Sequence, residues 1–328
     1  MLLSLGLTLP ADSTPENPPP FLNGFPQDLS GGGPYTNLPT QATLAQLDKT
    51  QNGRVIVFAT QDRAGDSLIC SGHVYVYGGD GALHWAAPLP QPPGMGPSVA
   101  DLNGDGVADV VIGYGEMKTA CSTGGGVRAF DGVDGHMLWD FATAPRSGKG
   151  SVYSTPAIAD VNGDGQPEVA FGSWDQCIYL LDHNGQSLWP IPHLNNECNN
   201  RGYLNGDVVS SSPALADLDG DGQLEIVIGS AINTSAPFEP TKGYLNVMRS
   251  SDSALLARWA FQESISSSPA IADLNNDGVL DIVVGTGEDI NNQGIFVQSF
   301  HYDPKIYKMT ERLVHNWLGN TLGYVFSS

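Results

Sequence analysis

The sequence predicts an all-β protein, a β-propeller built from four-stranded antiparallel blades of which about five are readable. Three observations predict this fold. A segment of 17 residues recurs four times at nearly constant spacing, and each copy is followed by short β-rich runs separated by Gly, Asn and Asp turns. Gly and Pro make up 19% of the 328 residues, which is typical of a chain with many turns.

The four copies align without gaps and share the pattern P-x-x-A-D-x-[ND]-x-D-G-x-x-[DE]. Their leading Asp residues are 59, 57 and 56 positions apart, and the copies occupy residues 97–113, 156–172, 213–229 and 269–285. An eroded copy at residues 42–59 has one inserted residue, and Gln46 replaces its first Asp. Self-similarity of this kind indicates a repeat architecture.

Each copy predicts the same order of strands. Its apolar end is followed by a variable loop, a second apolar run, a turn and a Trp-containing run, as expected for antiparallel strands. These two later runs are HVYVYG and ALHWAA, then VRAFDG and HMLWDF, then CIYLLD and SLWPI, then YLNVMR and LLARWAF. Four strands in about 57 residues fit a propeller blade better than a solenoid coil, and the WD40 signature is absent.

The domain organisation follows from the repeats. We expect a leader at residues 1–20 and a single propeller domain at 21–328, with repeats starting near 41, 97, 156, 213 and 269. The apolar start of the leader is typical of a signal peptide that lacks its positive n-region; a frayed terminus is the alternative. Either the chain closes as a small ring, with FLNGFPQDL (21–29) completing a blade from the C-terminus, or it is a fragment of a six- to eight-bladed ring. We favour the fragment.

Oxygen-bearing side chains alternate along a tight loop in each copy. Alternation points three of them inward, and the Gly after the third allows a sharp turn. Hard oxygen ligands in a flexible loop suit Ca²⁺, whereas Mg²⁺ requires a stricter octahedron. We therefore expect about four Ca²⁺ sites, with the ligands Asp101, Asn103, Asp105 and Asp109; Asp160, Asn162, Asp164 and Glu168; Asp217, Asp219, Asp221 and Glu225; and Asp273, Asn275, Asp277 and Asp281.

Two other interpretations of these loops are weaker. An EF-hand is excluded because the twelfth position is an apolar strand residue instead of Glu. Solvated turns without metal would not require the same carboxylate spacing four times. The loops hold 13 of the 35 acidic residues, and four Ca²⁺ ions would change the formal charge from −21 to −13. Such acidity also excludes nucleic acid as a partner, and no apolar run is long enough for membrane insertion.

The run S-P-A-[IL]-A-D-[LV]-[ND]-x-D-G-x-x-[DE]-[IV]-[VA]-[IVF]-G resembles the FG-GAP/VCBS repeat family over roughly residues 40–300. That family includes the propeller of integrin α-subunits and many secreted bacterial propellers. The resemblance implies a calcium-binding, integrin-alpha-like propeller that is secreted, displayed on the cell surface or periplasmic. It implies no particular ligand, because the family serves adhesion, polysaccharide binding and enzyme scaffolding.

Catalytic motifs are absent from the sequence. There is no H-E-x-x-H, G-x-S-x-G or Walker A motif, and His73, His136 and His183 lie in or beside turns. The sequence therefore favours a binding or adhesion module for carbohydrate or protein over an enzyme. The alternative is a polysaccharide lyase or hydrolase that uses the propeller as a scaffold, since such sites have no fixed sequence spacing.

Four cysteines lie in or beside the predicted loops: Cys70, Cys121, Cys177 and Cys198. Three pairings are possible. Their loop positions favour Cys70–Cys121 with Cys177–Cys198, which an oxidising compartment would allow. Four free buried thiols are the alternative.

The long variable loops predict the ligand-binding face. Because strands alternate in direction, the metal loops share one rim with the turns between strands three and four, and the longer loops share the other rim. Variable loops on a rigid scaffold commonly carry function. The candidate stacking residues are Tyr114, Tyr153, Trp174, Tyr203 and Phe238; for Trp174, packing across the blade is the alternative.

Overall fold

The computed structural model describes residues 38–47, 53–64, 67–115, 124–144, 150–189, 198, 201–205, 207–231, 243–261, 264–286, 296–303 and 308–312. The elements named within these residues are all β-strands, and they form five antiparallel sheets. The predicted all-β propeller fold is confirmed. Within the described part of the chain, no helix has the length and apolar character needed to cross a membrane.

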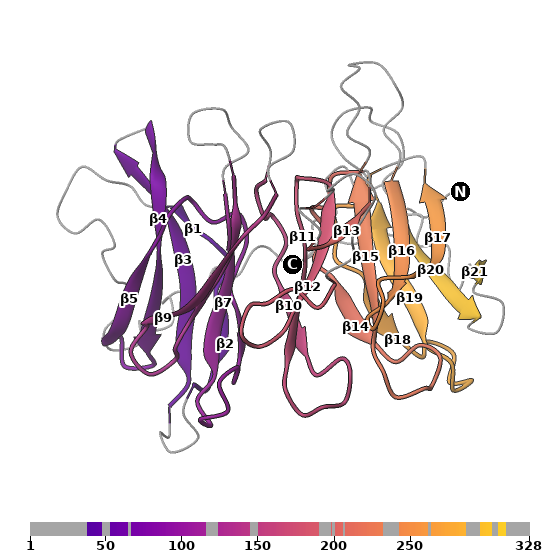
Figure 1. The fold of residues 1–328 in the computed structure, drawn as a ribbon, viewed down its shortest axis with the longest axis horizontal. Coiled ribbons are helices and arrows are strands. Elements are labelled where there is room, and N and C mark those ends of the chain that lie inside the picture. Colours follow the sequence, from indigo (N-terminus) through magenta and orange to yellow (C-terminus); the bar gives the residue numbers. More distant parts are fainter. Residues whose placement is uncertain are drawn as a thin grey trace, which may run out of the picture.

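Each sheet is one blade, and its strands follow one another in chain order (Figure 1). In the first blade, β1 (Leu38–Pro39) and β2 (Thr43–Ala45) both pair with β3 (Val55–Ala64), followed by β4 (Ser67–Gly78) and β5 (Leu83–Leu89). The second blade contains β6 (Ser98–Ala100), β7 (Asp109–Tyr114), β8 (Gly126–Phe130) and β9 (Met137–Ala142).

The remaining three blades have the same order. The third contains β10 (Ala157–Ala159), β11 (Glu168–Gly172), β12 (Cys177–Leu181) and β13 (Tyr203–Leu204). The fourth contains β14 (Ala214–Ala216), β15 (Glu225–Ala231), β16 (Gly243–Arg249) and β17 (Leu255–Phe261). The fifth contains β18 (Ala270–Ala272), β19 (Asp281–Thr286), β20 (Phe296–Asp303) and β21 (Lys308–Arg312).

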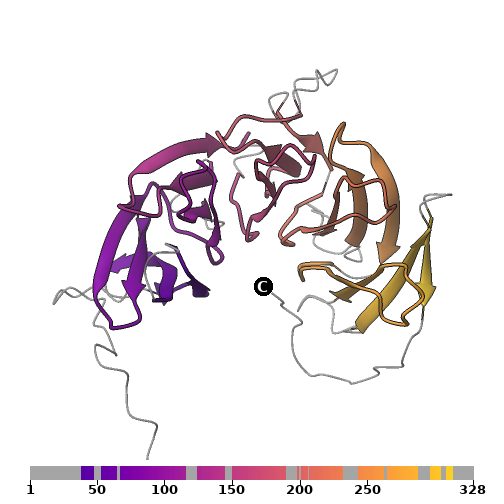
Figure 2. The ribbon, with the colours of Figure 1, turned by 90° about the horizontal axis from the view of Figure 1, so that it is seen from below.

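The described blades are arranged side by side around an arc, which Figure 2 shows from below. The short inner strands β2, β6, β10, β14 and β18 are neighbours in this order. The first and last described blades are separated in this view, so the described sheets form an open arc. The segment FLNGFPQDL, proposed to complete a blade, lies outside the described residues.

The core is divided among the interfaces between blades. Side chains alternate along a strand, so each sheet buries one set against the preceding blade and the other against the next. In β7, Val110 and Ile112 pack with Val57 of the first blade, whereas Val111 packs with Val169 of the third. Full burial of such a side chain stabilises the fold by about 1.5–3 kcal/mol.

The third blade departs from the predicted strand order. Its fourth strand is β13, not SLWPI (187–191), and β13 pairs with the start of β12. Trp189, from the predicted strand, is 1% exposed and lies in no named strand. Its indole N–H donates to the carbonyl oxygen of Ser250 in the next blade. Trp189 therefore connects the third blade to the fourth although it lies outside the named strands.

Candidate metal-binding loops

The first Asp of each repeated loop organises the backbone that follows it. Asp101 Oδ1 accepts a hydrogen bond from Gly104 N at 2.8 Å, and Oδ2 accepts one from Gly106 N at 2.9 Å. The same bonds are made in the second and third loops, by Asp160 with Gly163 and Gly165 and by Asp217 with Gly220 and Gly222. In the fourth loop, Asp273 accepts from Asp277 N and Gly278 N.

The glycines are required by backbone conformation. Gly104 and Gly106 have φ of 76° and 88°, a region that costs an L-residue about 1–2 kcal/mol. The corresponding glycines of the second and third loops are also at positive φ. In the fourth loop Asn276, at φ 58°, occupies the position of Gly104. Asn tolerates this conformation better than most residues, so the loop keeps its shape.

The last carboxylate of each loop opens the second strand of its blade and is buried. Asp109, Glu168, Glu225 and Asp281 are each at most 1% exposed. Each accepts a hydrogen bond from the residue after the first Asp, for example from Leu102 N to Asp109 Oδ2 at 2.9 Å. Burial raises the pKa of Asp109 to about 6 and of Glu225 to about 7, and it also raises the pKa of Glu168. Holding these groups ionised therefore costs free energy that a bound cation would offset.

Three predicted ligands of the third loop are brought together, and their oxygen donors fit a hard cation. Oxygen atoms of Asp217, Asp219 and Glu225 lie within 4.8 Å of one another, a spacing that one ion can bridge. In the fourth loop, Asp281 Oδ1 is buried with no hydrogen-bond partner among the described residues, and it lies 3.5 Å from His301 Nδ1. The structure thus contains acidic clusters that could hold metal ions.

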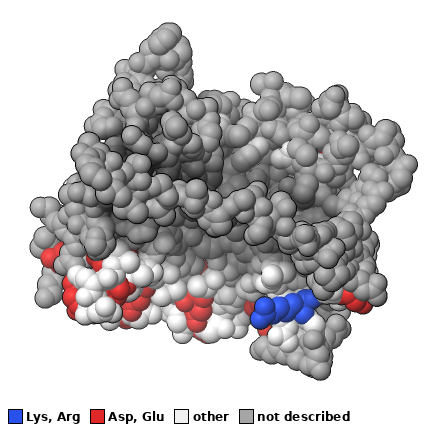
Figure 3. All heavy atoms as spheres, turned by 180° about the vertical axis from the view of Figure 1, so that it is seen from behind, with Lys and Arg blue, Asp and Glu red and all other residues white. Residues whose placement is uncertain are grey.

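The loops lie on one edge of the molecule. Asp105, Asp164, Asp221 and Asp277 are exposed, whereas the last carboxylate of each loop is buried. Figure 3 shows Asp and Glu atoms distributed along the lower edge of the described surface.

A second acidic cluster was not predicted. Asp131, Asp134 and His136 have atoms within 4.8 Å of one another, in the turn between β8 and β9. His136 Nδ1 lies 2.7 Å from Asp134 Oδ1, and both side chains are exposed. The sequence predicts a solvated turn residue at His136, because His136 lies in or beside a turn. The buried member, Asp131, is adjacent to the first metal loop.

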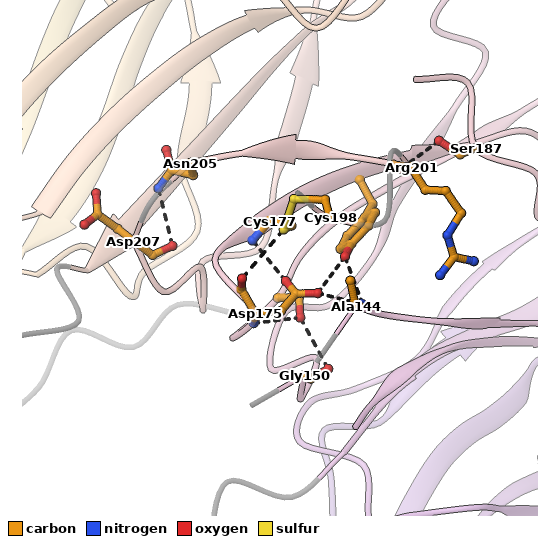
Figure 4. Close-up of a disulfide and its surroundings, with 11 residues drawn as sticks. Ala144, Gly150, Asp175, Cys177, Ser187, Cys198, Arg201, Asn205 and Asp207 are labelled. Carbon is orange, nitrogen blue, oxygen red and sulfur yellow. Dashed lines mark hydrogen bonds between the residues drawn. A yellow bond between two sulfur atoms is a disulfide. The ribbon is translucent and has the colours of Figure 1, made fainter. Parts of the chain in front are cut away.

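The opposite rim carries a disulfide. Cys177 and Cys198 are joined, with Cα atoms 6.1 Å apart, as the loop positions predicted (Figure 4). Cys70 is also disulfide-bonded, and its expected partner Cys121 lies outside the described residues. The bond at Cys198 holds the chain that leads into β13 beside β12.

An unpredicted buried carboxylate supports this disulfide. Asp175 is 0% exposed and accepts hydrogen bonds from Tyr179 Oη at 2.6 Å and from the backbone N–H groups of Cys177 and Ala144, both at 3.0 Å. Figure 4 shows it between the disulfide and Ala144. Burial raises its pKa to about 6. Asp175 thereby ties the second blade to the third.

The predicted stacking residues lie in different environments. Tyr114 is only 5% exposed, donates a hydrogen bond to Asp140 Oδ1 at 3.0 Å and lies beneath the Arg128 guanidinium, so it is a packing residue. Tyr153 and Trp174 are half-buried neighbours, with ring centroids 6.1 Å apart. The predicted stacking residues also include Tyr203, half-buried in β13, and Phe238, outside the described residues.

Trp174 also has the packing role considered as its alternative. Its indole N–H donates to Ser210 Oγ at 3.1 Å, and its backbone N–H donates to the carbonyl oxygen of Ser151. These bonds fix the indole in place. A fixed and half-exposed ring is suitable for stacking as well as for packing.

Comparison with solved structures supports the fold. The C-terminal domain of PilY1 from Pseudomonas aeruginosa superimposes with a TM-score of 0.53 at 13% identity, covering 82% of this chain and 70% of that one. BamB from Moraxella catarrhalis has a TM-score of 0.46 at 14% identity, covering 82% of this chain. This chain spans 63% of the BamB chain, and at these identities the likeness concerns the fold alone.

Comparison by sequence finds a similarity over one part of the chain. No curated protein is matched by the sequence. A family model described as the FG-GAP-like repeat matches residues 48–112, which include most of the first blade and the first metal loop. The expected resemblance is confirmed over this segment. The chain therefore folds as a β-propeller and carries an FG-GAP-like repeat at residues 48–112.

Proposed function

We propose that this chain is a calcium-stabilised binding module that works outside the cytoplasm, with a carbohydrate or a protein as its ligand. A propeller fold with an FG-GAP-like repeat suggests a binding or scaffold module. The observation that carries the calcium assignment is the fourfold recurrence of one loop, with its first Asp capping the backbone and its last carboxylate buried.

Calcium in this proposal joins the first two strands of a blade. The first Asp follows the inner strand, and the last carboxylate opens the next strand, so one ion contacts both. Without it, three or four carboxylates repel one another within one loop. An ion that binds only the folded chain adds roughly 2.7 kcal/mol per site at a hundredfold excess over Kd.

The rim opposite the metal loops is the proposed ligand face. Tyr153, in the connection between β9 and β10, and Trp174, in the turn between β11 and β12, support this choice because their half-exposed rings are adjacent. Aromatic faces of this kind stack on sugar rings or fill an apolar pocket of a protein partner. The Cys177–Cys198 disulfide holds the neighbouring chain and supports an oxidising compartment.

Thermal unfolding with calcium and with EDTA tests the metal assignment. We expect calcium to raise the midpoint of the wild-type chain, and we expect the rise to be smaller in Asp217→Asn. Asp80→Asn is the matched control, because Asp80 lies in an exposed turn outside the repeated loops. An unchanged midpoint in excess EDTA would show that the loops do not depend on metal.

A glycan and protein binding screen tests the ligand face. We expect Trp174→Phe to weaken whatever interaction the screen yields, whereas Tyr114→Phe should leave it unchanged. Turnover of a polysaccharide during the screen would instead favour the lyase or hydrolase alternative.

A further inference from the structure

One cross-strand position next to the metal loops changes its chemistry from blade to blade. The last carboxylate of a loop pairs with a residue on the third strand: Glu225 with Arg249, and Asp281 with His301. In the second blade, the registered pair Val110 and Phe130 places Asp131 opposite Asp109. In the third blade, the pair Val169 and Leu181 places Asp182 opposite Glu168. The position is therefore Asp, Asp, Arg and His in successive blades.

Asp131 contacts the first metal loop directly. Its Oδ2 accepts a hydrogen bond from Asn103 Nδ2 at 3.2 Å, and the next residue, Gly132, donates its N–H to Asp109 Oδ1 at 3.0 Å. Asp131 is 7% exposed, so its charge is poorly screened. Because the amide nitrogen of Asn103 is bound to Asp131, the amide oxygen of Asn103 faces the loop, where it accepts a hydrogen bond from Asp105 N. Asp131 thus orients one predicted ligand and adds negative charge to the site.

Asp182 has the same place beside the second loop. Its Oδ1 accepts hydrogen bonds from Asn184 N and Gln186 N of its own turn, which fixes the carboxylate at this position. In the fourth blade, Arg249 brings a positive charge to this position, and its Nη1 lies 3.0 Å from Asp252 Oδ2. The loop beside Arg249 is also the loop in which Asp219 replaces the Asn of the other three.

We infer that this cross-strand position tunes calcium binding by the loop of its own blade: Asp131 and Asp182 strengthen it, and Arg249 weakens it. The inference rests on the proposed function. Calcium affinity of oxygen-ligand loops varies with the number of charges and with rigidity. Groups that orient metal ligands typically change affinity by about 10–100-fold when they are removed. Asp131 is a positioning residue in this sense, and Asp182 and Arg249 act through their charge.

The test is calorimetric titration of the calcium-free full chain with calcium chloride, for the wild type and single variants. Asp131→Asn should weaken one binding constant about tenfold, and Asp182→Asn should weaken another. Arg249→Gln should strengthen one constant several-fold. These effects should shrink in high salt, because the tuning is largely electrostatic.

Two control variants test whether calcium affinity depends on where the charge lies. One is a control for Asp131, and the other tests the ion pair of Arg249. Asp134→Asn removes the same charge from an exposed place in the same turn as Asp131, so it should change calcium affinity far less. Asp252→Asn breaks the ion pair of Arg249 but keeps its charge, so it should not strengthen binding. Equal effects of Asp131→Asn and Asp134→Asn would overturn the inference.

The outcomes also distinguish this inference from the proposed function. If the wild-type chain gives no calcium-binding heat in any buffer and EDTA does not lower its unfolding midpoint, the calcium assignment fails and the inference fails with it. If the wild type binds calcium and the constants of Asp131→Asn, Asp182→Asn and Arg249→Gln equal those of the wild type, only the inference is wrong.

Discussion

The indole N–H of Trp189 donates a 2.6 Å hydrogen bond to the carbonyl oxygen of Ser250, 61 residues later in the chain and in the next blade. Trp85 and Trp139 make equivalent bonds, to Gly132 and to His183, at 3.0 and 2.9 Å. In three successive blades, a Trp thus fastens its blade to a turn of the following one. In these three blades, the Trp of the repeat connects its blade to the next one.

Removing this connection should destabilise the propeller. We expect Trp189→Phe to lower the free energy of unfolding by about 1–3 kcal/mol, because it leaves the buried Ser250 carbonyl without its donor. Urea unfolding followed by far-UV circular dichroism measures this change. Trp174→Phe is the control, because the indole of Trp174 is half-exposed and water can replace it as a donor to Ser210. Equal losses in both variants would contradict the role of Trp189.

A side chain at the second glycine of a metal loop should destabilise the fold through backbone strain. Gly106 has open space around an added Cβ, but its φ is 88°. We therefore expect Gly106→Ala to destabilise the calcium-free chain by about 1–2 kcal/mol through backbone strain. Gly53→Ala is a matched control, since Gly53 also has open space around it and no positive φ. A loss in Gly53→Ala as large as in Gly106→Ala would exclude strain as the cause.

Much of this architecture could be predicted because the contacts that shape each repeated loop are made between residues close together in the sequence. The first Asp, the Gly and the last carboxylate form contacts within nine residues, so the alternation of polar and small residues was enough to place the loops. Tyr114 was predicted to be exposed because nothing near it in sequence reveals Asp140, its hydrogen-bond partner. Asp131 was not predicted, and Trp189 was placed in a strand, for the same reason: their contacts depend on strand register and on the next blade.

Replacing the buried Glu225 should have opposite effects with and without calcium. Burial raises its pKa to about 7, so the ionised carboxylate is costly in the metal-free fold. Glu225→Gln removes that cost while its amide oxygen can still accept from Leu218 N. We expect the variant to unfold at the same or a higher temperature in EDTA, but to gain less from calcium than the wild type. Differential scanning calorimetry in both buffers measures this, and an undiminished calcium gain would contradict a ligand role.

Asp175 should make the stability fall as pH rises. Burial raises its folded pKa to about 6 from an ordinary value of 3.8, so between these values the folded chain binds more protons than the unfolded one. Stability from this group is therefore largest below pH 4 and declines up to about pH 6, by about 3 kcal/mol at most. We expect Asp175→Asn to lower stability overall but to flatten this decline. Urea unfolding from pH 4 to 7 in saturating calcium measures the slopes, and equal slopes would contradict the assignment.

The Cys177–Cys198 disulfide should stabilise the third blade through the chain that it closes. Its cysteines are 21 residues apart, and cross-linking a loop of that length removes unfolded-state entropy worth about 3 kcal/mol. β13 depends on this bond in particular, because it is only two residues long and pairs with Cys177 and Ile178. We expect the double variant Cys177→Ala, Cys198→Ala to unfold at lower urea and to lose amide-exchange protection at Leu204 before Leu180 of β12. Protection lost equally at both residues would show that the disulfide stabilises the whole blade and not its last strand.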